Sequence, residues 1–528
     1  MSRLDVLFVI PTNVLDFNEG RVKDAREPPA KARFIAAYLL RRGCGVDLID
    51  SNITNHTPEL MAEEVVARKP RLVVIPVYGY NPSASTQTMP SARKYAQAIK
   101  DVAPDIPILF SGTHPAALPK MTLLEEPTDY VCSGEGPITV HELLEVLKNE
   151  NRGIEKVRGL WRWQDGGAVA NDPAPLIDLN QEPVSLEAWR LMDPRQYSAH
   201  HWQNFYRGDD NRGPYANPYS IEGCPFHCSF CNIQAPYREG EQQARGVGKL
   251  KQGVNSYRFL RPDLFVAELE FLVEEFGVRL VKIPDEMFAL NTSHVLKISE
   301  MVAERFGDSL NFWCYVRVDT CKPRFLDPMR AAGFRWLGVG IEAADSTVRS
   351  GQDKSFGEDT IYGVISQIHS AGIEGGLNYI FGLPGDTMES MQATYELACR
   401  LNGTYGNFYC AQALPGSQLH QEATLSGYPL PERPRGPGWM GYAQYSYESE
   451  PYYVGDALTP AQVLAFRDRR HIDYYCRPEY QKRILSDPKF GPEALASIIV
   501  WIRGLAPDKL RRKIIEEARR ESVVTATS

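Results

Sequence analysis

The first 150 residues alternate between short, continuously apolar runs and longer segments with helical periodicity. The run at 4–10 ends at Pro11 and has the character of a parallel strand buried on both faces. Similar strands are expected at 46–50, 72–77, 106–111 and 130–132. Helical segments separate them at 28–42, 59–68, 89–102 and 139–148. This alternation predicts an α/β domain over residues 1–150, with a doubly wound, Rossmann-like parallel sheet.

A second alternating series follows a connecting segment at 151–214, which is rich in Trp, Pro, Asn and Gln and contains a small hairpin at 159–163 and 168–171. Strands are expected at 219–222, 280–283, 311–318, 336–341, 376–381 and 406–413. Six parallel strands separated by helices predict a partial or full βα barrel over residues 215–430. Residues 431–528 begin with an aromatic-rich stretch, and amphipathic helices at 460–476 and 510–520 predict a helical C-terminal extension.

Charge and hydropathy exclude several kinds of partner. The chain has 66 acidic and 58 basic residues and a net charge of −8, which argues against binding to nucleic acid or to an anionic membrane surface. No apolar run approaches the roughly 18 residues of a membrane span, and the N-terminus lacks a secretory cleavage pattern. We therefore expect a cytoplasmic protein, whose ten cysteines are free thiols or metal ligands rather than disulfides.

Three cysteines share one short loop in a C-x3-C-x2-C spacing: Cys224, Cys228 and Cys231. Three thiolates can bind three irons of a 4Fe–4S cubane and leave the fourth iron open. Gly223 and Pro225 suit a tight loop after a strand, where a barrel places its chemistry. Two other interpretations are three free thiols on a turn and a zinc site. Zinc usually takes four protein ligands, and no fourth cysteine lies at a suitable spacing.

With an aromatic residue before the last cysteine, the loop resembles that of the radical S-adenosylmethionine (SAM) superfamily, and the resemblance extends through residues 215–430. It implies a cluster that binds SAM at its open iron and cleaves it reductively. It also implies SAM contacts from Phe230 in the cysteine loop and from four residues at the ends of the barrel strands: Asp285, Glu286, Arg317 and Glu342. Each has a plainer interpretation, because the acidic pair could cap a helix and Arg317 could pair with Asp319.

Loops of small and polar residues follow several strands of the N-terminal domain. Ligands of doubly wound sheets bind at the carboxyl ends of the strands, where such loops collect. The residues selected for this reason are Thr12, Asn13, Tyr78, Asn81, Ser83, Ser85, Gly112, Thr113, His114, Gly134, Glu135 and Gly136. Ordinary turn chemistry would give a similar composition.

Taken with the barrel, the Gly-Thr-His-Pro-Ala-Ala-Leu-Pro run from Gly112 and the Ser-Gly-Glu-Gly run from Ser133 resemble the cobalamin-binding radical SAM family. The resemblance implies cobalamin as a further cofactor. Many cobalamin proteins carry an Asp-x-His-x-x-Gly motif after the first strand, but this chain has no histidine before His56. We therefore expect cobalamin without a histidine lower ligand; a cofactor-free domain of the same fold is the alternative.

The resemblance also implies an activity, that of a cobalamin-dependent radical SAM methyltransferase. In such enzymes cob(I)alamin takes a methyl group from one SAM, and a 5′-deoxyadenosyl radical from a second SAM abstracts hydrogen from an unactivated carbon. The substrate radical then takes the methyl group from methylcobalamin. A small-molecule substrate of secondary metabolism and an electron donor such as a flavodoxin or ferredoxin are implied. The alternatives are a cyclase, a ring-rearranging or an oxidative enzyme without methyl transfer, and a non-catalytic sensor.

Overall fold

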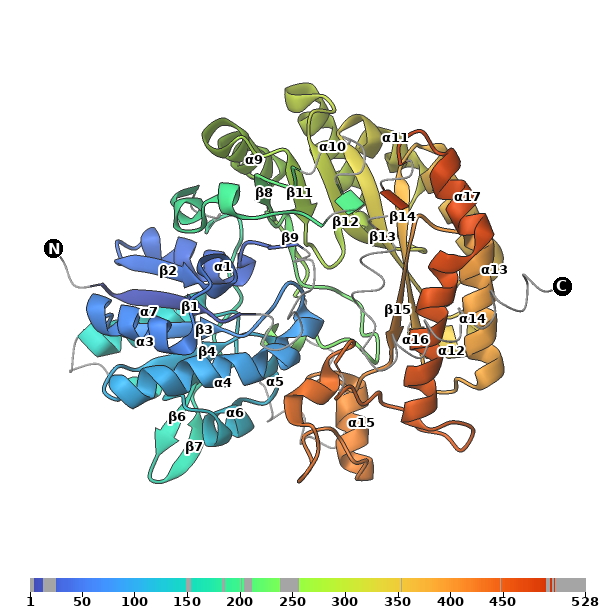
Figure 1. Ribbon diagram of the computed structural model, residues 1–528. Coiled ribbons are helices and arrows are strands. Elements are labelled where there is room, and N and C mark those ends of the chain that lie inside the picture. Colours follow the sequence, from blue (N-terminus) through green and yellow to red (C-terminus); the bar gives the residue numbers. More distant parts are fainter. Residues whose placement is uncertain are drawn as a thin grey trace.

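The chain forms two α/β units that lie side by side, with the C-terminal helices on the far side of the second (Figure 1). The computed structural model describes residues 4–12, 25–148, 153–182, 186–200, 202–203, 211–237, 256–352, 354–446, 448–490, 494–495 and 498. The expected helix at 510–520 lies outside the described residues. Within the described part of the chain, no helix has the length and apolar character needed to cross a bilayer.

The N-terminal unit is built on a seven-stranded sheet in the order β2-β1-β3-β4-β5-β6-β7. Its parallel strands are β1 (Val6–Ile10), β2 (Val46–Asp50), β3 (Leu72–Pro76), β4 (Ile108–Ser111) and β5 (Tyr130–Cys132). Every residue of β1, β3 and β4 is buried, as expected for strands covered on both faces. The doubly wound sheet predicted from the apolar runs is confirmed.

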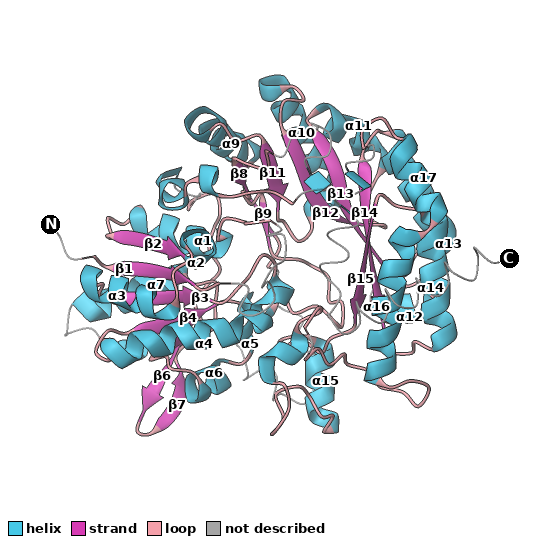
Figure 2. Ribbon diagram, in the orientation of Figure 1, coloured by secondary structure: helices cyan, strands magenta, loops and turns pink. Residues whose placement is uncertain are grey.

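Helices cover both faces of this sheet (Figure 2). They are α1 (Ala30–Leu40), α2 (Ser51–Thr54), α3 (Pro58–Arg68), α4 (Ser85–Val102), α5 (Thr113–Ala117), α6 (Pro119–Glu125) and α7 (Pro137–Lys148). The start of α3 shows why they begin where they do. Thr57 accepts a hydrogen bond from the backbone of Leu60, and Pro58 occupies the first helical position, where no amide donor is needed.

The expected hairpin exists, but it belongs to the N-terminal sheet rather than to a separate connecting segment. Its strands are β6 (Leu160–Gln164) and β7 (Gly167–Ala170), and β6 pairs antiparallel with β5. Trp161 is buried against the sheet edge together with Leu123 and Val131. The hairpin therefore covers an edge that would otherwise be open.

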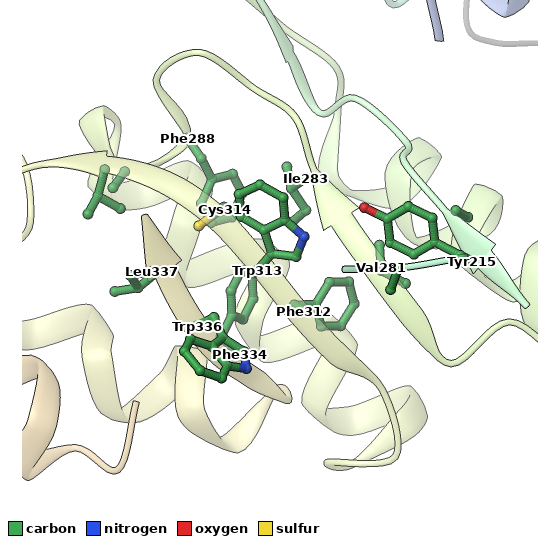
Figure 3. Close-up of a cluster of buried hydrophobic side chains, with 14 of the residues drawn as sticks. Tyr215, Val281, Ile283, Phe288, Phe312, Trp313, Cys314, Phe334, Trp336 and Leu337 are labelled. Carbon is green, nitrogen blue, oxygen red and sulfur yellow. The ribbon is translucent and has the colours of Figure 1, made fainter. Parts of the chain in front are cut away.

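The second unit contains a six-stranded parallel sheet in the order β15-β14-β13-β12-β11-β8, which forms a partial barrel. The strands are β8 (Tyr215–Ala216), β11 (Leu280–Ile283), β12 (Asn311–Arg317), β13 (Phe334–Glu342), β14 (Glu374–Phe381) and β15 (Tyr405–Cys410). Its helices are α9 (Pro262–Phe276), α10 (Thr292–Phe306), α11 (Pro323–Ala331), α12 (Ser346–Ser350), α13 (Glu358–Ser370), α14 (Met388–Leu401) and α15 (Gln418–Ser426). Figure 3 shows the buried cluster that joins β11, β12 and β13, with Phe312 and Phe334 stacked at 5.0 Å between ring centroids.

The predicted first barrel strand at 219–222 was wrong. The strand that joins the barrel sheet is β8, four residues earlier, where Tyr215 pairs with Leu280. Ser220 instead holds Asp285 through its backbone amide and hydroxyl. The next two residues form β9 (Ile221–Glu222), which pairs antiparallel with β10 (Arg258–Phe259).

The last strand of the barrel, β15, is covered by α16 (Pro460–Cys476) and α17 (Pro478–Ser486), and α16 confirms the helix expected there. Side chains hydrogen-bond backbone groups along this strand. The Gln444 amide binds the amide and the carbonyl of Cys410, each at 2.9 Å. The Tyr475 hydroxyl accepts from the Gly406 amide at 3.0 Å and donates to its carbonyl at 2.8 Å. These bonds satisfy edge groups that a further strand would otherwise pair.

Candidate cofactor site at the domain interface

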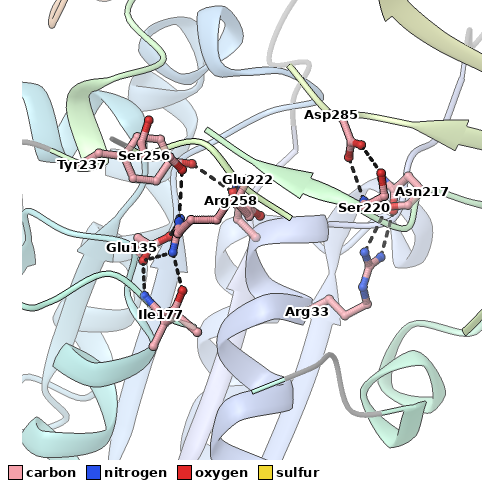
Figure 4. Close-up of polar contacts among 11 residues, drawn as sticks. Arg33, Glu135, Ile177, Asn217, Ser220, Glu222, Tyr237, Ser256, Arg258 and Asp285 are labelled. Atoms are coloured by element: carbon pink, nitrogen blue, oxygen red, sulfur yellow. Dashed lines mark hydrogen bonds and ion pairs between the residues drawn. The ribbon is translucent and has the colours of Figure 1, made fainter. Parts of the chain in front are cut away.

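Charged contacts fix the carboxyl edge of the N-terminal sheet against the start of the barrel (Figure 4). Arg258, next to the cysteine loop, binds both carboxylate oxygens of Glu135 at 2.5 and 3.1 Å. Lys31 of α1 forms an ion pair with Glu222 of β9 at 2.5 Å. Arg33 of the same helix donates to the side chain and the carbonyl of Asn217, each at 3.0 Å. The two units therefore meet through defined pairs, with the cysteine loop at their junction.

The loop after β9 carries Cys224, Cys228 and Cys231. Gly223 precedes it with a φ of +81°, and a Cβ there would overlap the Ser256 carbonyl, so the chain needs glycine at this turn. The Cys231 amide donates to the Cys228 carbonyl at 3.0 Å. Gln234 donates to the Cys224 carbonyl. These contacts fix the conformation of the loop that carries the three thiols.

The donor set of this loop fits an iron–sulfur cubane. The three cysteines form no disulfide, and each is of intermediate exposure. The three thiolates of such a loop can each bind a different iron of a cubane and leave the fourth iron open, whereas a structural zinc site usually takes four protein ligands. Burial raises the pKa of Cys231 to about 12, and iron ligation would hold the group as thiolate.

Arg317, at the end of β12, lies against the cysteine loop. Its guanidinium donates to Cys228 Sγ at 3.6 Å and lies 3.7 Å from the centroid of the Phe226 ring. It also pairs with Asp319 at 2.8 and 2.9 Å, the plainer role considered for it. Phe230 is half-buried and packs against the apolar clusters around Ala343 and Leu419. The SAM contact of each residue stays a prediction.

The two acidic residues after β11, Asp285 and Glu286, have different surroundings. Asp285 is fully buried and accepts from the Ser220 amide at 2.9 Å and from its hydroxyl, so it holds the segment that leads into the cysteine loop. Both carboxylate oxygens of Glu286 are buried without a hydrogen-bond partner. Burial raises the pKa of Glu286 to about 8, and the charge of Lys31 opposes the shift. Unpartnered acceptors of this kind are rare, and they point to a bound donor.

Glu342, after β13, has a φ of +69° and lies at a register shift between β13 and β14. Its carboxylate forms an ion pair with Lys354, a buried residue from the segment after α12. Lys354 was missed by the sequence argument, because nothing in its spacing relates it to Glu342. The contact of Glu342 with SAM stays a prediction.

A pocket lies where the N-terminal sheet edge meets the cysteine loop. Residues of both units line it: Lys31, Phe34, Ile35, Pro76, Tyr78, Ser111, Gly112, Thr113, Gly134, Glu135, Ile233, Pro236 and Tyr237. Five of the residues selected from the sequence are among them: Tyr78, Gly112, Thr113, Gly134 and Glu135. Ile233 follows Cys231 by two positions, so the pocket adjoins the cluster loop.

The loop after β4 combines a close backbone approach with an unsatisfied polar group. Gly112 has a φ of +125°, and a Cβ there would overlap the Val77 carbonyl, so the loop closes against the segment after β3 only because the residue is glycine. Thr113 has a buried hydroxyl with no hydrogen-bond partner. No histidine lines the pocket, so its neutral groups could hold corrin amides without ligating cobalt.

Two other residues selected in this domain hydrogen-bond the backbone. Asn81 caps a short turn at Ala84, and Ser85 binds the Val77 carbonyl and the His114 amide. Thr12 lies 3.4 Å from the Ser91 hydroxyl. Gly136 has a φ of +107° and abuts Ile35. Ser83 is exposed, and Asn13 lies outside the described residues. The structure does not place these residues in the pocket lining.

His114 is buried away from the pocket. Its Nδ1 lies 3.2 Å from the Thr86 hydroxyl, and its ring packs edge-on against Trp439 at 4.5 Å between centroids. Burial lowers the pKa of His114 to about 3, so the imidazole is neutral at neutral pH. Trp439, from the aromatic stretch after residue 430, thus packs the C-terminal region onto the N-terminal unit.

Comparison with known families identifies the two units. The B12 binding domain family matches residues 24–144, and the radical SAM superfamily matches residues 219–398. The chain therefore combines a B12 binding domain with a radical SAM domain. These two matches confirm the cofactors predicted from the sequence, a 4Fe–4S cluster, SAM and cobalamin. The protein is therefore a cobalamin-dependent radical SAM enzyme.

Several relatives match most of this cobalamin-binding radical SAM chain. An uncharacterized methyltransferase of Pyrococcus horikoshii is 23% identical over 480 residues, which are 91% of this chain and 94% of that protein. The anaerobic magnesium-protoporphyrin IX monomethyl ester cyclase of Rubrivivax gelatinosus is 24% identical, over 79% of this chain and 69% of its own length. Curated relatives thus include both a methyltransferase and a cyclase.

Solved structures show the same fold. The radical SAM methyltransferase TsrM of Kitasatospora setae, with cobalamin and a 4Fe–4S cluster bound, matches with a TM-score of 0.66 and 18% identity over 98% of this chain and all of that one. The cobalamin-dependent SAM radical enzyme OxsB matches with a TM-score of 0.57 and 14% identity, covering 81% of this chain and 56% of OxsB. Both likenesses support the arrangement of a parallel sheet followed by a partial barrel.

Proposed function

We propose that the protein is a cobalamin-dependent radical SAM methyltransferase acting on an unactivated carbon of a small molecule. One observation carries the proposal: the pocket at the N-terminal sheet edge is lined both by Tyr78, Gly112 and Thr113 and by Ile233 and Tyr237 beside the cysteine loop. A cofactor bound there lies next to a cluster on that loop. Methyl transfer to a carbon radical needs this proximity, because the radical must meet the methyl donor before it is quenched.

When bound, the cluster and SAM supply a radical that removes hydrogen from the substrate, and cobalamin supplies the methyl group. The chain's own residues bind and orient these groups. Cys224, Cys228 and Cys231 would hold three irons. Glu286 offers free carboxylate oxygens at the barrel edge, suited to the amino group of SAM. The interface pairs Lys31–Glu222 and Arg258–Glu135 keep the two cofactor sites at a fixed separation.

The test uses anaerobically purified, iron-reconstituted protein with cobalamin, a low-potential reductant and methyl-labelled SAM. We expect 5′-deoxyadenosine formation and transfer of the labelled methyl group from SAM to bound cobalamin. With candidate metabolites, a product heavier by one methylene and carrying the label supports the proposal. A Cys228→Ala variant serves as the matched control, which should lose 5′-deoxyadenosine while the N-terminal domain still binds cobalamin. Cobalamin that stays unlabelled under conditions where 5′-deoxyadenosine forms would reject methyl transfer.

The relative from Rubrivivax gelatinosus favours a second candidate, a cyclase or oxidative enzyme that uses cobalamin without net methyl transfer. Product mass separates the two, since a cyclisation removes hydrogens or adds oxygen and a methylation adds one methylene. A small-molecule substrate and a donor of the flavodoxin or ferredoxin type complete the proposal. A cytoplasmic location suits it, because that compartment keeps thiols reduced.

A further inference from the structure

One part of the cysteine loop faces solvent. Pro225 and His227 are exposed, whereas Ser229, which follows them, is buried. Phe226, between the two exposed residues, packs against the Arg317 guanidinium, which lies 3.7 Å from the centroid of its ring. The layer of protein between the loop and the surface is therefore thin on this side.

Two cations adjoin this part of the loop. Arg317 pairs with Asp319, and Lys322 donates to the Asp319 carbonyl at 2.5 Å. Arg324 donates to the Thr292 hydroxyl at 2.8 Å. Lys322 and Arg324 are both exposed, and within the described part of the chain neither forms an ion pair with a carboxylate. Two positive charges are thus available to a partner beside the cysteine loop.

The stability of the fold does not explain where these two charges lie. Lys322 and Arg324 flank the first residue of α11, and no acidic residue occupies the first turn of that helix. The N-terminus of a helix carries a partial positive charge, which favours acidic side chains and disfavours cations. The cations therefore occupy positions that α11 alone would select against, and an external role accounts for them better.

An open hollow of about 670 Å³ lies next to the two cations. Arg324 lines it together with Tyr257, Leu290 and the start of α10, and none of its lining residues that the structure describes is acidic. Tyr257 follows Ser256, whose hydroxyl donates to the Cys224 carbonyl at 3.5 Å. The wall of the hollow is therefore one residue away from a contact with the cysteine loop.

The charge of the whole chain makes this local surface significant. With a net charge of −8, the protein as a whole repels an acidic partner, so such a partner needs a local cationic surface to approach. Electron donors of the flavodoxin type are acidic proteins whose flavin exposes one apolar edge. A partly apolar hollow with a cationic rim complements a face of that kind.

We propose that Lys322, Arg324 and the hollow beside Tyr257 form the docking site for a flavodoxin-type electron donor. The proposal rests on the proposed function and adds the place where its electrons enter. In each transfer the anionic flavin hydroquinone of the donor loses one electron and becomes the neutral semiquinone. The oxidised cluster gains that electron, and no proton moves. The segment from Tyr257 through Ser256 to Cys224 gives a short path between the two.

The test compares two electron sources for the full-length, reconstituted protein. Dithionite is too small to need a docking surface, whereas a purified flavodoxin in its hydroquinone state must bind first. The double variant Lys322→Glu/Arg324→Glu reverses both charges and puts acidic residues where a helix start favours them, so the fold should be kept. Titration with oxidised flavodoxin measures affinity, and stopped-flow absorbance measures the rate of cluster reduction.

We expect the affinity of the double variant for flavodoxin, and its rate of cluster reduction by flavodoxin, each to fall about tenfold or more at low salt. Its iron content and its 5′-deoxyadenosine formation with dithionite should equal those of the wild type. Added salt should slow the reduction of the wild type towards the rate of the double variant, because screening removes the same attraction.

Lys94→Glu/Lys482→Glu is the matched control, since it changes the net charge equally at exposed residues of α4 and α17. The control should keep wild-type reduction by flavodoxin, and an equal loss in the control would overturn the proposal. Wild-type affinity and reduction rate in the double variant would also overturn it, as would a wild type reduced by dithionite but not by flavodoxin. Wild-type protein that forms no 5′-deoxyadenosine with dithionite would instead refute the proposed function.

Discussion

The barrel and the N-terminal unit use the same edge of the same kind of sheet, yet the two edges differ in chemistry. The barrel edge gathers ionizable side chains, including three thiols, the unpartnered Glu286 and the Lys354–Glu342 pair. The N-terminal edge is lined mostly by neutral groups. Its two charged lining residues, Lys31 and Glu135, are each paired with a residue of the barrel.

This difference separates two ways of holding a cofactor. A cluster is held by a few covalent ligands, so each ligand is indispensable and its spacing is visible in the chain. A corrin held without a protein ligand to cobalt depends on shape and on many weak hydrogen bonds spread over several loops. Loss of one polar group there should cost little, whereas loss of space should cost a great deal.

The largest effect should follow from removing a thiol at the barrel edge. Cys224→Ala, Cys228→Ala or Cys231→Ala should lose most of the cluster iron and all SAM cleavage, because each thiolate binds its own iron. The other cysteines should be individually replaceable: Cys44, Cys132, Cys314, Cys321, Cys399, Cys410 and Cys476. Iron analysis and 5′-deoxyadenosine assays check the prediction for both groups of cysteine variants. SAM cleavage by any of the three loop variants would contradict the assignment of these cysteines to the cluster.

Displacing a loop that lines the N-terminal pocket should have the next largest effect. In Gly112→Ala the new methyl group would overlap the Val77 carbonyl at a φ of +125°, so the loop that carries Gly112 and Thr113 must move. Cobalamin binding should then fall more than about tenfold while cluster iron is retained. Gly166→Ala is the matched control, since Gly166 has a φ of +77° and nothing within 4 Å of a Cβ. Equal cobalamin retention in the two variants would mean that the pocket is not the corrin site.

The two neighbouring carboxylates of the barrel edge should respond differently. Glu286→Gln should weaken SAM binding about tenfold with little loss of stability, because its oxygens have no protein partner. Asp285→Asn should instead lower the free energy of unfolding by about 1–3 kcal/mol, because it weakens buried bonds to Ser220. Calorimetric SAM titration and chemical denaturation distinguish them. Weaker SAM binding in Asp285→Asn together with lower stability in Glu286→Gln would contradict both assignments.

The smallest effect should come from His114→Ala. Since the imidazole packs on Trp439 and does not line the pocket, the cob(II)alamin resonance should show no nitrogen superhyperfine splitting from an axial imidazole in either protein. Cobalamin stoichiometry should stay near one per chain, as a single open-sheet site implies. A splitting present in the wild type and absent from the variant would establish axial ligation.

The sequence predicted what depends on local pattern and missed what depends on distant contacts. Strands β2, β5 and β11 lie where their apolar runs placed them. The first barrel strand was misplaced, because the apolar segment around Ile221 pairs with residues 258–259 instead. In the site, the three thiols were visible as one motif. Lys354 and Arg258 were not, because folding alone brings them to Glu342 and Glu135.

The capped edge of β15 has a consequence for synthesis on the ribosome. The side chains that satisfy the backbone of this strand, among them Gln444 and Tyr475, lie well after the strand in the chain. At roughly 5–20 residues per second, the cap emerges several seconds after the strand. During that interval the nascent barrel presents a bare strand edge to other chains. Translation speed through residues 411–475 is therefore expected to influence the yield of native protein.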